Sequence, residues 1–182
     1  MKPFLVALGT VAATLSPTLV PVAGAMRALD PTRTLMYTRY AAAAYCKGAL
    51  VENFECKSCT GLTGRFITSF GNSLLDTSGY VAVDETDKRI ILVFRGTSGL
   101  INKLTDVTAI PVPILGGPLG SLVHSGFKVA IKSMASSFLP VIKTLLVSPP
   151  YADYRVAVVG HSMGGAIASL ATVKLNHSLG LD

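Results

Sequence analysis

An apolar run at residues 154–159, followed by apolar positions at helical spacing as far as residue 176, predicts a strand followed by a helix. The stretch of residues 154–159 is short and mostly apolar, with several valines, which is typical of a strand buried on both faces. Residues 163–176 contain no proline, and Ile167, Leu170, Ala171 and the aliphatic stem of Lys174 recur at helical spacing. A glycine-rich turn joins the two elements.

The first half of the chain predicts one helix and three strands. Asp30 followed by Pro31 is typical of an N-cap and a first helical residue, so we expect a helix from there to about residue 45, with Leu35, Met36 and Tyr40 available for packing. Strands are predicted at residues 64–70, 79–83 and 89–94. A polar turn at residues 84–88 joins the last two into a hairpin. Because residues 90–94 are all apolar, we expect the last strand to be central.

The middle of the chain predicts a long helix after an irregular segment. Residues 100–107 have the spacing of a short amphipathic helix, and the prolines and glycines of residues 111–118 argue against regular structure for about ten residues. Apolar side chains then recur three and four residues apart, which predicts a core-facing helix kinked by Pro140. They are Phe127, Ile131, Met134, Phe138, Val141, Ile142 and Leu145.

The N-terminal segment has the layout of a secretory signal. A short positive start precedes the apolar residues 4–15, and Ala23-Gly24-Ala25 offers a cleavage site. We therefore expect a signal peptide at residues 1–25, a mature domain at residues 26–182, and an extracellular protein. No transmembrane segment is predicted, because Pro140 interrupts the longest remaining apolar stretch.

Composition and charge favour one globular domain and exclude a nucleic-acid-binding class. Half of the 182 residues are hydrophobic, and the formal net charge is +6. The basic residues are scattered, without a basic run or basic residues alternating with aromatic ones. We therefore expect no nucleic-acid partner.

The three cysteines leave one residue over. Cys56 and Cys59 fit a redox pair, half of a zinc site or a local disulfide, and the secretory route together with the absence of a second Cys/His pair favours the disulfide. Cys46 is then a free thiol, pairs between chains, or has its partner outside this sequence. No metal or other cofactor is predicted.

The candidate chemistry lies at Ser162, the centre of a Gly-x-Ser-x-Gly pattern. A serine on a tight strand-to-helix turn projects its hydroxyl away from the backbone and can attack a carbonyl carbon. The pattern alone also occurs in ordinary glycine-rich turns with an exposed serine. The strand predicted before it and the helix predicted after it favour the catalytic interpretation.

Five ordered motifs give the chain a resemblance to the secreted fungal triacylglycerol lipases, the class 3 lipases of the α/β-hydrolase superfamily. They are Ala44-Tyr45-Cys46, Cys56-Lys57-Ser58-Cys59, Val93-Phe94-Arg95-Gly96-Thr97, Val123-His124-Ser125-Gly126-Phe127 and Gly160-His161-Ser162-Met163-Gly164-Gly165. The resemblance spans about residues 30–176. It implies an α/β-hydrolase fold, in which helices flank a central, mixed and mostly parallel sheet, here lacking its C-terminal part.

The resemblance also implies a role for several residues. Ser162 matches the nucleophile, and the backbone N–H of Met163 and the N–H and hydroxyl of Thr97 match the oxyanion-hole donors. An ordinary strand-end threonine is the alternative for Thr97. Residues 98–106 match the lid, with a lysine where relatives commonly have tryptophan after the asparagine, which bears on activation at an interface. The lid residues are Ser98, Leu100, Ile101, Asn102, Lys103, Leu104 and Asp106.

The catalytic acid and base of the family have no counterpart in the sequence. A hydrolase triad runs in the order Ser, Asp or Glu, then His, and neither His124 nor His161 matches the base. His177 lies fifteen residues after Ser162 on the same predicted helix, about 22 Å away along its axis. Relatives also bridge the counterpart of Cys46 to a cysteine near their C-terminus. We therefore expect a truncated lipase that is nearly inactive alone.

The function implied by the resemblance is hydrolysis of carboxylic esters, most specifically of triacylglycerols at an oil–water interface through a serine acyl-enzyme. A feruloyl esterase or a phospholipase on the same scaffold is one alternative. A secreted lipid-binding protein without catalysis is another. The sequence predicts no oligomeric state.

Overall fold

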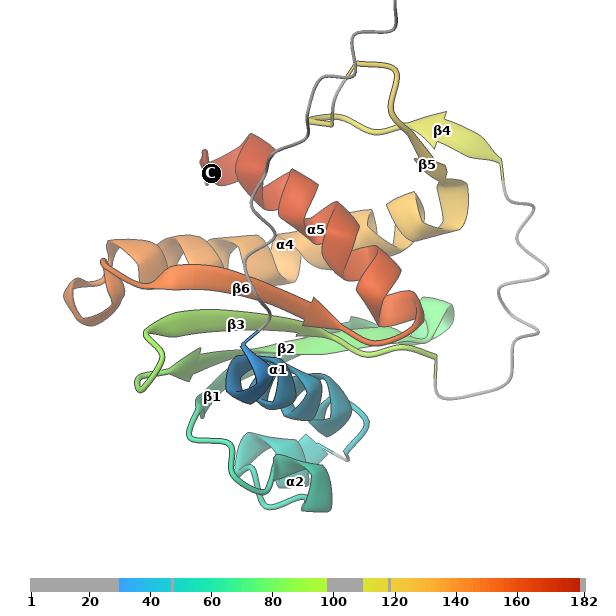
Figure 1. Cartoon of the computed structure of the whole chain (residues 1–182). Coiled ribbons are helices and arrows are strands. Elements are labelled where there is room, and N and C mark those ends of the chain that lie inside the picture. The colour runs from blue at the N-terminus through green and yellow to red at the C-terminus, as the bar shows by residue number, and fades with distance from the viewer. Residues whose placement is uncertain (1–29, 47, 98–109, 118, 181–182) are drawn as a thin grey trace, which may run out of the picture.

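The computed structural model describes residues 30–46, 48–97, 110–117 and 119–180, and its centre is a four-stranded mixed sheet flanked by helices (Figure 1). The strand order is β1-β2-β3-β6. The strands are β1 (Arg65–Asn72), β2 (Thr77–Asp84), β3 (Arg89–Phe94), β4 (Pro111–Pro113), β5 (Leu122–His124) and β6 (Arg155–Gly160). The α-helices are α1 (Pro31–Ala43), α2 (Gly48–Glu52), α4 (Ser125–Val147) and α5 (Met163–Leu179). Short 3-10 turns are η1 (Lys57–Cys59), η2 (Ser73–Leu75) and η3 (Pro149–Tyr151).

Strands β1, β2 and β3 form an antiparallel meander, and β6 adds to β3 in parallel. The three strands predicted at 64–70, 79–83 and 89–94 and their hairpin are thus confirmed. The β3–β6 register runs from Arg89 opposite Arg155 to Phe94 opposite Gly160. Strand β3 has a partner on each side, as its apolar sequence predicts. The carboxyl ends of β3 and β6 consequently lie side by side.

Alternate side chains of β2 and β3 enter two separate cores. Val81, Ile90 and Leu92 face α4 and α5 on one side of the sheet. Ala82 and Ile91 face α1 and the cysteine-containing segment on the other. Figure 1 shows the two layers of helices, with α1 and α2 below the sheet and α4 and α5 above it. The period-two pattern of the strands thereby fixes which helices cover which face.

Helix α1 begins as the sequence predicts. The side chain of Asp30 caps it and accepts hydrogen bonds from the N–H groups of Thr32 and Arg33, at 3.0 and 3.3 Å. Tyr40 is fully buried, but Leu35 is 52% exposed, so the expectation that Leu35 packs is wrong. Residue 35 lies on the face of the helix that points away from the sheet.

Asp84, at the end of β2, is a fully buried carboxylate. It accepts hydrogen bonds from the hydroxyl of Tyr40 at 2.9 Å and from the N–H groups of Thr86 and Asp87 at 3.0 Å, with Thr63 at 3.4 Å. Burial, followed by this hydrogen bond, raises the pKa of the Tyr40 phenol well above its usual value. The carboxylate thus ties α1 to the β2–β3 turn, where an unsatisfied buried charge would be costly.

Strand β6 is less buried than its sequence predicts. Helix α5 packs on it from one side and α1 contacts it from the other, yet its apolar residues are only half-buried. The reason is its place at the end of the described strand order, where β3 covers only one of its edges. Both faces of β6 are thus covered as expected, and its free edge leaves the strand half-buried in the described residues.

Residues 110–124 are more regular than expected, because β4 and β5 form an antiparallel ribbon. The N–H of Ile114 donates to the carbonyl of Ser121, and the carbonyl of Ile110 accepts from Ser125. Positions 110 and 114 therefore face the partner strand, and Pro111 and Pro113 occupy the alternate positions. A proline nitrogen that faces away from the ladder loses no hydrogen bond, so the expected absence of regular structure is wrong.

Helix α4 continues through Pro140 from residue 125 to residue 147, which confirms the long helix. Its length and composition would suffice to cross a membrane, so Pro140 does not interrupt this stretch as expected. One face of the helix packs into the core above the sheet, as in the core helix of a globular domain. Its buried residues are Ala130, Ile131, Met134, Ala135, Phe138, Ile142 and Leu145.

Candidate active site

Ser162 occupies the sharp turn between β6 and α5 with φ 56° and ψ −127°. A positive φ is strained for a residue with a side chain, and such strain concentrates at functional sites. The residue is exposed, and α5 starts immediately after it. The strand, turn and helix predicted around this serine are thus present.

Two glycines make the turn possible. A Cβ atom on Gly160 would lie 2.2 Å from the carbonyl oxygen of Gly164. A Cβ atom on Gly164 would lie 2.3 Å from the carbonyl oxygen of Phe94, at the end of β3. Both contacts are with backbone, which cannot move aside cheaply. The first turn of α5 therefore lies directly against two strand ends.

The segment after β3 is held beside the elbow in the same way. A Cβ atom on Gly96 would lie 2.7 Å from the carbonyl oxygen of His161 and 3.3 Å from the Cβ of Ser162. The side chain of Arg95 forms an ion pair with Asp76 at 2.8 Å, which ties this segment to the β1–β2 connection. Thr97 follows directly and is half-buried.

Thr97 borders two cavities. One, of about 500 Å³, is also lined by Ser162 and His161. The other, of about 430 Å³, is also lined by Met163 and Phe127 and is mostly apolar. Met163 is the first residue of α5, so its N–H has no acceptor within the helix. Thr97 thus lines one cavity with Met163 and the other with Ser162, the residue before Met163.

The structure gives the three histidines separate surroundings. The Nδ1 of His161 lies 3.0 Å from the hydroxyl of Tyr45, a contact that the sequence did not predict although Tyr45 lies in one of the five motifs. The Nδ1 of His124 accepts from the N–H of Gly126 and caps α4. His177 lies near the end of α5. Among the described residues, no hydrogen bond joins a histidine to Ser162.

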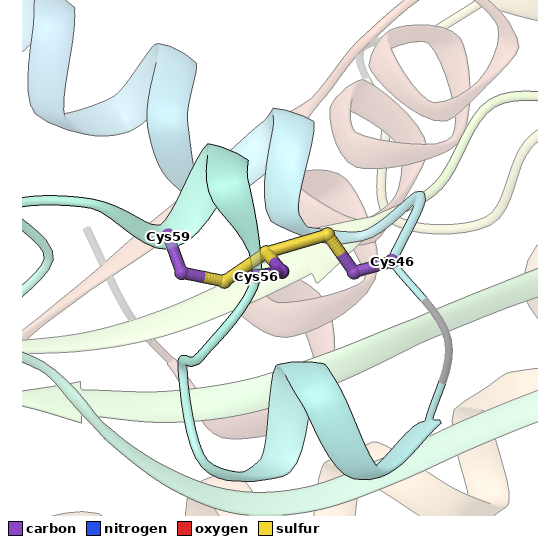
Figure 2. Close-up of side chains that lie close together, drawn as sticks. All are labelled: Cys46, Cys56 and Cys59. Carbon is purple, nitrogen blue, oxygen red and sulfur yellow. A yellow bond between two sulfur atoms is a disulfide. The ribbon is translucent and has the colours of Figure 1, made fainter.

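Figure 2 shows Cys46, Cys56 and Cys59 gathered beneath α1, and we call this group the cysteine cluster. The predicted Cys56–Cys59 disulfide is present, and Cys46 also lies within bonding reach of Cys56. The Cα–Cα distances, 6.3 and 5.0 Å, suit a disulfide in both cases. A sulfur atom forms one disulfide at a time, so the two pairings exclude each other.

When Cys56 pairs with Cys59, Cys46 is left over as the sequence predicts, but the structure adds the Cys46–Cys56 pairing as an alternative that the sequence did not indicate. The three sulfur atoms lie within 4.8 Å of one another, close enough to share a metal ion when reduced. A disulfide uses two of the three thiolates that a metal would need. The oxidised cluster consequently offers no such site.

The predicted lid lies outside the described residues. It comprises Ser98, Leu100, Ile101, Asn102, Lys103, Leu104 and Asp106, within the undescribed range 98–109. The described chain ends on one side at Thr97, beside Ser162, and resumes on the other at Ile110, before β4.

A strained serine on a strand–turn–helix elbow, at the carboxyl end of a parallel strand pair and between two layers of helices, defines an α/β-hydrolase. Residues 91–179 match the family model described as "Lipase (class 3)". The chain belongs to the fungal-type class 3 lipases.

Characterised relatives agree with this assignment. A lipase of Rhizopus niveus is 36% identical over 145 residues, which cover 76% of this chain and 36% of the relative. The secreted mono- and diacylglycerol lipase A of Penicillium camembertii is 32% identical over 151 residues, 48% of its length. The aligned residues thus cover between about a third and a half of the length of these curated relatives.

Solved structures show the same fold. Lipase II from Rhizopus niveus superposes with a TM-score of 0.71 at 33% identity, over 82% of this chain and 58% of that one. A mono- and diacylglycerol lipase from Aspergillus oryzae superposes with a TM-score of 0.66 at 32% identity, over 79% and 56%. The predicted α/β-hydrolase fold is therefore confirmed.

Proposed function

We propose that the chain is the nucleophile-bearing part of a secreted triacylglycerol lipase, in which Ser162 forms the acyl-enzyme. The observation that carries the proposal is the strained elbow at Ser162, which directly precedes α5 and lines a cavity together with Thr97. Membership of the class 3 lipases supports ester hydrolysis as the reaction. The relatives named as secreted lipases support an extracellular location, as does the signal-like N-terminus.

In the proposed mechanism the oxygen of Ser162 attacks the ester carbonyl carbon, and the carbonyl oxygen becomes an oxyanion. The N–H of Met163 and the N–H and hydroxyl of Thr97 donate hydrogen bonds to it. One such donor typically lowers the barrier by about 3 kcal/mol. The alcohol then leaves, and water releases the fatty acid from Ser162.

The apolar cavity beside Met163 and Thr97 suits the acyl chain. Its walls include Leu74, Leu75 and Phe127 from the β1–β2 connection and the start of α4. Leu74 is 89% exposed, so the cavity opens at an apolar surface. The mostly apolar lining favours an aliphatic chain. The polar side chains at its wall are Asp76, Thr77, Thr97 and Ser125.

The proposal needs a general base that the described residues do not place near Ser162. The aligned residues cover only 36% of the Rhizopus niveus lipase and 48% of the Penicillium camembertii lipase. We infer that the base and its acid lie in the region of the relatives that has no match in these residues. In a serine protease, loss of the base lowers turnover by about six decades, so the 182 residues alone should be nearly inactive.

A lid at residues 98–106 completes the proposal. The proposed lid would follow directly after Thr97, which lines both cavities. A lid that moves at an oil–water interface would expose the apolar cavity to a lipid. Lys103 in place of the usual tryptophan would weaken its insertion into that interface.

The test uses residues 26–182 with an active-site-directed alkylphosphonate and a short p-nitrophenyl ester. We expect slow labelling of Ser162, its complete loss in Ser162→Ala, and ester turnover near background. Near-normal turnover that Ser162→Ala abolishes would refute the inference about the missing base. Phosphonate labelling that proceeds at the same rate in Ser162→Ala would overturn Ser162 as the nucleophile.

A further inference from the structure

A second apolar groove is lined by residues of α4 and α5 and by Ile114 and Leu115, which follow β4. Its volume is about 310 Å³. Its apolar lining includes Ile131 and Ala135, which are buried, and the half-buried Leu139 and Leu170. None of its lining residues is shared with the two cavities beside Thr97.

The loop of the β4–β5 ribbon bridges the two helices at this groove. On α4, the ammonium group of Lys128 donates to the carbonyl of Pro113 at 2.7 Å. On α5, the side chain of His177 lies so close to Gly116 that a Cβ atom there would be 2.5 Å from the Cβ of His177. Leu115 lies between these two contacts, lines the groove and is 72% exposed. The groove therefore has an apolar lining, a partial cover and an open mouth.

Three lysines line the same groove without a carboxylate. Lys128 and Lys132 come from α4, and Lys174 comes from α5. In the sequence, Asp153 is the only acidic residue between positions 107 and 181, and it pairs with Lys88 at 2.7 Å. Among the described residues, none of the three lysines forms an ion pair. Their aliphatic stems can lie on the apolar lining while the ammonium groups reach the rim.

We propose that this groove binds the anion of a long-chain fatty acid, with the chain on the apolar lining and the carboxylate among Lys128, Lys132 and Lys174. The charge complementarity selects an anion, and the apolar lining selects one with a hydrocarbon tail. The groove is concave and lies between two helices, so it fits a single chain better than the flat face of a bilayer. Binding here requires no catalysis at Ser162.

Dodecanoate, kept below its micelle concentration, is the probe, and calorimetric titration of the 182-residue chain is the measurement. We expect dodecanoate to bind at least tenfold more tightly than dodecanol, which has the same tail without the charge. Shortening the acid by two methylenes should weaken binding by about tenfold, since each buried methylene contributes about 0.8 kcal/mol. One exposed ion pair raises an affinity by up to about fivefold. The double variant Lys132→Gln/Lys174→Gln removes two such pairs, so we expect its affinity for dodecanoate to fall about tenfold.

Lys143→Gln is the matched control, because this lysine lies on α4 outside the groove lining and carries the same charge. It should bind dodecanoate as the unaltered chain does, and so should Ser162→Ala. An equal loss in Lys143→Gln would attribute the binding to net charge, and an unchanged double variant would place the ligand elsewhere. Either result overturns the proposal. So does binding to anionic vesicles without binding of monomeric dodecanoate, which would make the surface a membrane contact.

Discussion

The contact between Gly164 and the end of β3 makes one substitution especially informative. Gly164→Ala would place a Cβ atom 2.3 Å from the carbonyl oxygen of Phe94. The other atoms nearest to that Cβ also belong to the backbone of Phe94 and Arg95. Ordinary van der Waals contact begins at 3.4 Å, so α5 and β3 must separate by about 1 Å. The strain cannot be relieved by a rotamer change, because neither partner is a side chain.

The expected cost has two parts. Overpacking of this size destabilises a protein by about 1–3 kcal/mol. For a chain of 150–250 residues this corresponds to a fall in Tm of about 2–12 °C. The same separation moves Ser162 relative to Thr97, and a misplacement of about 1 Å typically costs about a hundredfold in rate. Labelling of Ser162 by an alkylphosphonate should slow accordingly.

Gly165→Ala is the control on the adjacent residue. A Cβ atom there would lie 3.3 Å from its nearest neighbour, the carbonyl oxygen of Gly160, so little has to move. Alanine is also favoured over glycine in a helix by about 1 kcal/mol. We therefore expect Gly165→Ala to be as stable as the unaltered chain or slightly more stable.

Urea unfolding followed by circular dichroism measures both variants, and phosphonate labelling well below Tm measures the site. The reasoning requires that Gly164→Ala loses stability while Gly165→Ala does not. Equal stability of the two variants would refute the backbone contact described between α5 and β3. Lost stability with unchanged labelling would refute only the link between that contact and the position of Ser162.

Further predictions concern the buried polar groups and the cysteine cluster. Asp84→Ala should destabilise the chain by about 3 kcal/mol or more in urea unfolding, since several buried donors lose their acceptor, whereas the exposed Asp153→Asn should leave the midpoint unchanged. Burial raises the pKa of both Tyr40 and Tyr80 above the unfolded value of about 10. The contribution of these two phenols to stability is complete below that pH and is lost as pH rises through their folded-state pKa. An ultraviolet pH titration should therefore show the two phenols ionising only when the chain unfolds. Ionisation of every tyrosine in the folded chain would contradict this. Alkylation and peptide mapping of the 182-residue chain should find one disulfide and one blocked thiol in the cysteine cluster, and three blocked thiols would contradict the pairing.

The elements set by local sequence could be predicted, because their causes lie within a few residues. The Asp30 cap, the β2–β3 turn and the glycines around Ser162 each depend on short-range geometry. The resemblance carried the fold class further, since five motifs in order identify the superfamily. Thr97 and Met163 came from the same resemblance, and the structure brings both beside Ser162.

The features that were missed depend on distant contacts. The half-burial of β6 follows from its place at the edge of the described sheet, which the periodicity of residues 154–159 cannot show. The β4–β5 ribbon follows from which side of the ladder each proline faces. The pairing of Tyr45 with His161 joins residues more than a hundred positions apart, and the reach of Cys46 to Cys56 depends on how α1 and α2 fold back on each other.

The parallel pairing of β3 with β6 also determines when the site forms. The β1–β2–β3 meander joins near neighbours in the chain, whereas the β3–β6 register joins Arg89 to Arg155, more than sixty positions away. The entropy of closing so long a loop delays this pairing during folding. In pulsed hydrogen exchange, amides of β2 and β3 should gain protection before those of β6. Ser162 lies at the end of β6, so the proposed nucleophile reaches its place only after the rest of the described four-stranded sheet has formed.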